Sequence, residues 1–265
     1  MTDHRLIIVK TSRLVLFVSA AALAVGCASS NKTTQSERPL TFDEATQLAS
    51  VQKRNYDDQG AVVRVSTAFT GTGDSMSMEA EIDWPGHQGH GVLSGRGMEE
   101  GISEVFWVAD AVLERRPALN VVLRGRGFAG VEFVARPPET DKRLLDRAVA
   151  VVVGLASKDP DNALLVQQKT GSAFLRNDVL RGKPVVVLRY GERNIYWLDQ
   201  ATGEMLRFEG NAAALTAPII VDVLERGKRS ITFPLASAVT EVGAIKEIYE
   251  TVTQRLVTAT TAAQN

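Results

Sequence analysis

The only cysteine of the chain, Cys27, ends a short apolar stretch near the amino terminus and is the residue best placed for covalent chemistry. Three basic side chains lie before residue 14, and residues 14–25 form the apolar run. This is the layout of a cleaved export signal. The run is too short for a membrane-spanning helix, which needs about 20 apolar residues. We therefore predict that residues 1–26 are a signal peptide.

The stretch Leu23-Ala24-Val25-Gly26-Cys27 resembles the lipobox of bacterial lipoproteins. The resemblance implies that the Cys27 thiol is diacylglycerylated, that the signal is cut before Cys27, and that the new amino group takes an acyl chain such as palmitate. Ala24 departs from the pattern, because leucine is commonest three places before the cysteine. A plain secretory signal with an incidental cysteine is the alternative. A single cysteine in an exported protein has no partner for an intramolecular disulfide, and lipidation explains its presence.

Other motifs that could carry chemistry lack the context that the chemistry needs. His87 and His90 have a spacing that two metal ligands can use, but no further ligand lies near them in the sequence. The G-x-G-x-x-G match at 125–130 is followed by a strand pattern, whereas a pyrophosphate site needs a helix there. The S-x-x-K match at 29–32 lies in a polar stretch with no pocket to activate a serine. We predict that the protein is not an enzyme and uses no cofactor or metal.

The composition excludes several classes of protein. A formal net charge of −1 argues against a nucleic-acid partner, which calls for a clustered basic face. Hydrophobic residues at 45% and charged residues at 23% are ordinary for a globular protein, so the bulk of the chain is not disordered. With one cysteine there is no intramolecular disulfide, and stability must come from burial.

The chain divides by composition into four parts. After the signal, residues 27–40 are polar and are predicted to be a flexible tether. Thr41 and Glu44 form a capping box that opens a helix, and a single domain is predicted over 41–257. Residues 258–265 are predicted to be a disordered tail.

Period-two patterns predict a sheet through most of the domain. Met76, Met78, Ala80, Ile82 and Trp84 share one face of a strand whose other face is polar, as an antiparallel strand with one dry side requires. The other predicted strands are 63–69, 91–95, 102–109, 120–124, 131–135, 183–190, 194–198, 204–209, 219–224 and 231–233.

Two further helices are predicted after the one that begins at Thr41. The segment 141–155 is apolar over more than half of its circumference and is predicted to be a buried helix. The segment 245–256 carries one apolar stripe. Strands in succession with few helices between them predict an α+β domain on an antiparallel sheet.

The segment Tyr196-Trp197-Leu198-Asp199-Gln200-Ala201-Thr202-Gly203-Glu204-Met205-Leu206-Arg207 resembles a hairpin common in envelope proteins of the LolA/LolB-like fold. It is also similar to segments of the LppX/LprG group of actinobacterial lipoproteins. The resemblance implies a curved antiparallel sheet, or half-barrel, closed by helices over an apolar cavity. In several members of that fold the cavity takes up acyl chains. Another branch binds an anti-sigma factor and senses envelope stress.

Two functions follow from that resemblance. The first is a membrane-anchored lipoprotein that binds or shuttles lipid or acyl chains. The candidate lipid-binding residues lie on the clearest strand and on the buried helix: Met76, Met78, Ile82, Trp84, Leu145, Val149 and Val152. An ordinary core between sheet and helix explains the same residues. The second function is a noncatalytic module with a packed core that binds an envelope protein or senses stress.

The anchor also predicts where the protein lies. Lipidation at Cys27 places the protein on the extracytoplasmic face of the cell membrane. The alternative is the inner leaflet of an outer membrane, which Ala28 after the cysteine permits.

Overall fold

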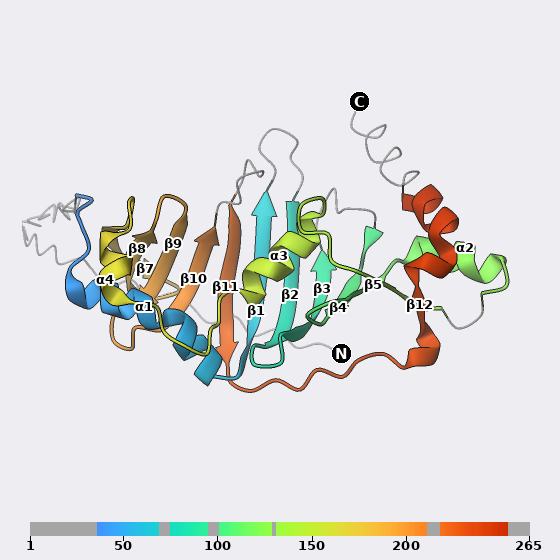
Figure 1. Cartoon of the computed structure of the whole chain (residues 1–265), viewed down its shortest axis with the longest axis horizontal. Coiled ribbons are helices and arrows are strands. Elements are labelled where there is room, and N and C mark those ends of the chain that lie inside the picture. The colour runs from blue at the N-terminus through green and yellow to red at the C-terminus, as the bar shows by residue number, and fades with distance from the viewer. Residues whose placement is uncertain (1–35, 69–74, 95–100, 129–130, 211–217, 254–265) are drawn as a thin grey trace, which may run out of the picture. The chain divides into compact units, whose positions relative to one another are not determined.

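The computed structural model describes residues 36–68, 75–94, 101–128, 131–210 and 218–253 (Figure 1). All of them belong to one compact unit that begins at Gln35. Cys27, the signal, the first part of the tether and the tail 258–265 lie outside the described residues. The last residues of the expected tether, in contrast, belong to the fold. The backbone of Arg38 pairs with that of Phe174, and Leu40 is buried in the core.

The described strands form one large, curved and unclosed sheet. The strands are β1 (Gly60–Ala68), β2 (Ser75–Asp83), β3 (Gln88–Ser94), β4 (Glu104–Trp107), β5 (Val112–Arg115), β6 (Phe133–Arg136), β7 (Ala173–Leu180), β8 (Lys183–Tyr190), β9 (Asn194–Asp199), β10 (Met205–Gly210), β11 (Ile219–Arg226) and β12 (Val239–Glu241). Their order is β12-β6-β5-β4-β3-β2-β1-β11-β10-β9-β8-β7. Among these pairs only β12 and β6 run parallel. The predicted fold class, α+β with a curved antiparallel sheet and a few helices, is confirmed.

Helices cover one face of this sheet. They are α1 (Phe42–Asp57), α2 (Pro117–Gly125), α3 (Leu144–Val153), α4 (Ala163–Gln168) and a helix over 246–253. Figure 1 shows α1 and α3 across one face, and α2 beside the carboxy-terminal helix at the β12 end. The predicted capping box is present: Thr41 Oγ1 accepts from Glu44 N, and Glu44 Oε2 accepts from Thr41 N.

The core lies between this face of the sheet and the helices α1 and α3. The apolar side of β2 is buried along its whole length while the polar side stays largely accessible, as the period-two pattern predicts. Buried side chains of β1, β2, β8, β9 and β11 join those of α1 and α3 in one cluster. A second, smaller cluster joins α2 to β6 and to Tyr249 of the carboxy-terminal helix.

Two predicted strands are wrong. The segment 120–124 lies in α2, because Pro117 suits the first turn of a helix and Leu119 and Leu123, four residues apart, share its buried side. The segment 231–233 is not a strand. It belongs to the connection from β11 to β12, where Phe233 packs on Phe106. The strands β5, β7 and β12 and the helix α4 were not predicted.

The helix α3 is held over the sheet at two points. Near its start, Asp146 accepts from Arg136 of β6 in a two-pronged ion pair, with Nη1 to Oδ2 at 2.6 Å and Nη2 to Oδ1 at 2.7 Å. Near its end, Trp84 Nε1 donates to the Val152 carbonyl at 3.1 Å. All four residues are buried. Because hydrogen bonds are directional, these two contacts set the position of α3 on the sheet and its rotation about its own axis.

The pair of Arg136 and Asp146 belongs to a larger buried network centred on Glu114 of β5. Glu114 accepts from Arg136 Nε at 2.9 Å, from Arg116 Nε at 2.7 Å and from the Tyr249 hydroxyl. Burial by itself raises the pKa of Glu114. The positive charges of Arg116 and Arg136 outweigh that effect and hold the pKa below its usual value. Glu114 is therefore charged in the fold and joins β5, β6 and the carboxy-terminal helix.

We expect Glu114→Gln to destabilise the protein by about 3 kcal/mol at pH 7, because it leaves two buried arginines short of one negative charge. A lowered folded-state pKa gives stability that is present above the unfolded-state value, about 4.3, and is lost as the pH falls through the folded-state value. The difference between wild type and variant must therefore shrink on acidification. Urea unfolding at pH 7 and at pH 3.5 measures it.

Glu104→Gln is the matched control, since Glu104 of the neighbouring β4 pairs with the half-exposed Arg115 at 3.2 Å. We expect a loss of less than about 1 kcal/mol there. An equal loss in the two variants, or a Glu114→Gln loss that does not change with pH, would contradict the role given to Glu114.

Candidate functional site

A mainly apolar pocket of about 320 Å³ lies beside the carboxyl half of α3, and we call it the α3 pocket. It is lined by His87, Trp107, Val108, Ala109, Val112, Pro138, Thr140, Asp146, Val149, Ala150, Val153 and Gly154. These residues come from the β2–β3 turn, the adjoining ends of β4 and β5 with the turn between them, the loop before α3, and α3 with the glycine that follows it. The two bonds that fix α3 therefore also fix one wall of the pocket.

Trp107 lies in the pocket wall because the neighbouring strand has no side chain at the contact point. A Cβ added to Gly89 of β3 would lie 2.1 Å from Cζ2 of the Trp107 ring. Glycine therefore lets the indole approach the backbone of β3. Trp107 is buried, and its Nε1 has no hydrogen-bond partner among the described residues. A buried donor without a partner costs about 1–3 kcal/mol, and a bound acceptor removes that cost.

The polar residues of the α3 pocket are few. The Asp146 carboxylate already accepts from Arg136 and from the Glu139 backbone N–H at 2.6 Å, so its charge is compensated. His87 closes the β2–β3 turn with a φ of 51°, a left-handed conformation in which His is enriched. The pocket thus has mainly apolar walls, and one wall residue, Trp107, carries a buried Nε1 that has no partner among the described residues. Such a lining suits an apolar ligand.

The seven predicted lipid-binding residues lie together in the main core cluster. Met76, Met78, Ile82, Trp84, Leu145, Val149 and Val152 are all buried there. Of these, only Val149 is in the wall of the α3 pocket, and Trp84 instead serves to hold α3. The structure brings the strand and the helix together as the sequence predicts. Binding of lipid by this set remains a prediction.

Sequence reasoning missed most of the pocket wall. Trp107 lies in the predicted strand 102–109, and Ala150 and Val153 lie in the predicted helix 141–155, but the sequence does not predict that they line one pocket. Their meeting depends on how α3 crosses the sheet, which periodicity does not specify. The Glu114 network was also missed. Its signal was the run Glu114-Arg115-Arg116 where β5 ends and α2 begins, because charges that become buried must find partners.

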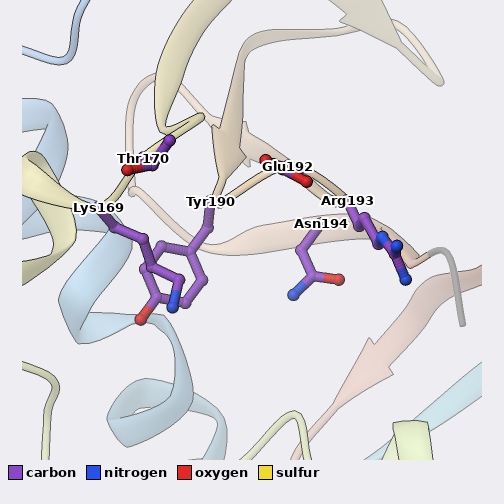
Figure 2. Close-up of a pocket in the computed structure, with 7 residues that line it drawn as sticks. Lys169, Thr170, Tyr190, Glu192, Arg193 and Asn194 are labelled. Atoms are coloured by element: carbon purple, nitrogen blue, oxygen red, sulfur yellow. The ribbon is translucent and has the colours of Figure 1, made fainter. Parts of the chain in front are cut away.

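Two other hollows are more polar. One, of about 440 Å³, lies at the β8–β9 turn, where Lys169 reaches alongside the Tyr190 ring and Arg193 extends from the turn (Figure 2). The other, of about 240 Å³, lies between the loop after β6 and the carboxy-terminal helix and is lined by Arg136, Arg143 and Tyr249 among others. The arginines of this second hollow already belong to the Glu114 network.

The histidines form no metal site in the described part of the chain. His90 stacks on Phe106 with ring centroids 4.3 Å apart and pairs with Glu104 at 2.9 Å, whereas His87 lies in the α3 pocket. No group of three or more His, Cys, Asp or Glu side chains gathers in the described ranges. No helix among those residues is long and apolar enough to cross a membrane.

No family model matches the chain, and no curated protein matches it. Several solved structures are similar in fold at low sequence identity. An uncharacterized conserved protein from Thermus thermophilus is 10% identical, with a TM-score of 0.37 over 71% of this chain and 94% of that one. A chain of the Pseudomonas aeruginosa MucA/MucB complex is 14% identical, with a TM-score of 0.32 over 74% and 58%.

A third similar structure is a putative outer membrane lipoprotein-sorting protein domain from Vibrio parahaemolyticus. It is 11% identical, with a TM-score of 0.30 over 80% of this chain and 99% of that one. These neighbours include a lipoprotein-sorting domain and a protein-binding one, and at such scores they do not decide between the two functions. No sequence family supports the finer resemblance to the LppX/LprG group.

We expect Ala150→Trp to close the α3 pocket without unfolding the protein, because Ala150 is exposed at the pocket mouth. Palmitate that binds the native state should raise the thermal midpoint of the wild type. The variant should bind at least about tenfold more weakly, a loss of about 1.4 kcal/mol, and show little shift.

Ala118→Trp is the control for Ala150→Trp, since Ala118 is also an exposed helical alanine but lies on α2, away from the pocket. It should respond to palmitate like the wild type. An unchanged palmitate response in Ala150→Trp would exclude the α3 pocket as the site.

Proposed function

We propose that the chain is a noncatalytic lipoprotein of the cell envelope that binds one acyl chain in the α3 pocket. The observation that carries this is the pocket itself: apolar walls, about 320 Å³ of space, and a buried indole donor without a partner among the described residues. The hydrophobic effect would drive binding, at about 0.8 kcal/mol for each buried methylene. No cofactor takes part in this proposal.

The size of the pocket limits what it can hold. It lies at the lower end of the range of about 300–1,000 Å³ for small-molecule sites. The core beneath α3 is filled by the protein's own side chains, including the seven predicted residues. The proposal therefore names a single acyl chain as cargo, and a multi-chain lipid would have to leave its other chains outside.

The polar end of the ligand is proposed to lie at Trp107, the wall residue whose Nε1 has no partner among the described residues. Trp107 Nε1 can donate to a carboxylate or to an ester carbonyl, and both occur at the end of an acyl chain. A plain hydrocarbon would leave the donor unsatisfied. We thus propose a fatty acid or an acyl ester as the ligand class.

The anchor is the second part of the proposal. A protein that exchanges acyl chains with a bilayer benefits from staying near it, and lipidation of Cys27 would provide this. The proposed place is the extracytoplasmic face of the cell membrane, with the inner leaflet of an outer membrane as the alternative.

A partner-binding or envelope-sensing module is the second candidate function. The close packing of the core favours it, because a sheet and helices filled by their own side chains can present a rigid surface without any cargo. In that case chemical cross-linking in the envelope would capture one protein, and the α3 pocket would stay empty.

Native mass spectrometry of the mature protein, purified from its own membrane, tests both parts of the first proposal. We expect a covalent mass that begins at Cys27 and includes its acyl groups. We also expect one noncovalent acyl ligand per chain, either co-purified or taken up from added palmitate. An unmodified Cys27 would overturn the anchor. No adduct even with excess palmitate would overturn the binding function and favour the partner-binding module.

A further inference from the structure

Three large apolar side chains are exposed close to the point where the chain enters the fold. Phe42 begins α1 and is 54% exposed, and Leu164 and Leu165 of α4 are 53% and 67% exposed. The helices α1 and α4 pack against each other, as Figure 1 shows at the blue start of the described chain. Other exposed large apolar side chains in the described ranges, such as Val179, lie singly on separate elements. We call Phe42, Leu164 and Leu165 the entry face.

The chain that leads toward Cys27 leaves the fold beside this face. Phe174 N donates to the Arg38 carbonyl at 2.8 Å, and Gln167 Nε2 of α4 donates to the Leu40 carbonyl at 3.0 Å. These bonds fix the chain up to Arg38. Cys27 is eleven residues before Arg38, a stretch that spans at most about 40 Å.

Basic side chains lie next to α4. Lys169 directly follows α4 and lies with Arg193 around the hollow at the β8–β9 turn (Figure 2). Lys169 Nζ is 5.4 Å from the centroid of the Tyr190 ring. Glu192 lies in the same hollow and Asp43 lies beside Phe42, so the region is mixed in charge. Lys169 is exposed and directly follows α4, so it is the cation nearest in the chain to Leu164 and Leu165.

We propose that the entry face docks on the bilayer that holds the lipidated Cys27, with Phe42, Leu164 and Leu165 inserted among the headgroups. This rests on the anchoring part of the proposed function. Three side chains are too few for a stable protein interface, which needs about 1,000 Å² or more. Three side chains can nevertheless be enough for contact with a membrane, because a short tether gives the entry face a millimolar effective concentration there. A weak contact then suffices to orient the domain.

The test uses the full lipidated protein in vesicles of pure lipid, with Leu165→Cys labelled by a nitroxide. An acylated Cys27 has no free thiol, so only position 165 takes the label. We expect collisions with a water-soluble paramagnetic quencher to fall at least about twofold when the label enters the headgroup region. Val179→Cys, on β7 with 63% exposure, is the matched control and should stay fully accessible.

Three other outcomes would overturn the docking, the anchor or both. Labelling of the wild-type protein would show a free Cys27 thiol, which overturns the anchor and with it the tethered docking. Equal accessibility at 165 and 179 on a properly acylated protein would overturn the docking alone. Protection of position 165 only in native membranes and not in pure lipid would assign the entry face to a protein partner and also overturn the proposal.

The cations are tested separately in the same experiment. Lys169→Gln should reduce the protection of position 165 in vesicles that contain anionic phosphatidylglycerol and leave it unchanged in neutral phosphatidylcholine. An equal effect in both kinds of vesicle would contradict contact between Lys169 and lipid phosphates.

Discussion

The position of one helix, α3, shapes the α3 pocket, and two buried polar contacts set the position of α3. Apolar packing alone lets a helix slide or rotate on a sheet, because dispersion forces have little direction. The two-pronged bond from Arg136 to Asp146 and the bond from Trp84 to the Val152 carbonyl remove that freedom. They fix a space beside the carboxyl half of α3 that the surrounding side chains do not fill.

A buried ion pair of this kind must itself be supported. Arg136 also contacts Glu114, which is bound by Arg116 and by Tyr249 of the carboxy-terminal helix. The cost of taking these charges out of water is offset only when each finds several partners. The last helix is therefore tied to the wall of the α3 pocket through three side chains, although it lies beyond β12 in the sequence.

Several elements of the fold could be predicted from the sequence because their signals are local. The alternation from Met76 to Trp84 and the capping box at Thr41 each depend on neighbours in the chain, and both are present. The strand predicted at 120–124 was wrong because a short apolar run fits a buried helix as well as a strand, and Pro117 favours a helix start. The α3 pocket joins segments from residue 87 to residue 154. No local sequence pattern predicts that these segments come together. Nor does one predict that Gly89 leaves room for the Trp107 ring.

The central claim, that the α3 pocket takes an acyl chain with its polar end at Trp107, is tested most directly by the indole N–H resonances of the protein in solution NMR. The chain has three tryptophans. Trp84 is already bonded to Val152, and Trp197 packs with a different cluster around β8. On titration with palmitate the account predicts a large downfield shift of the Trp107 signal, assigned by its absence in Trp107→Phe, while the other two stay in place. A Trp107 signal that does not move at saturating palmitate would contradict it.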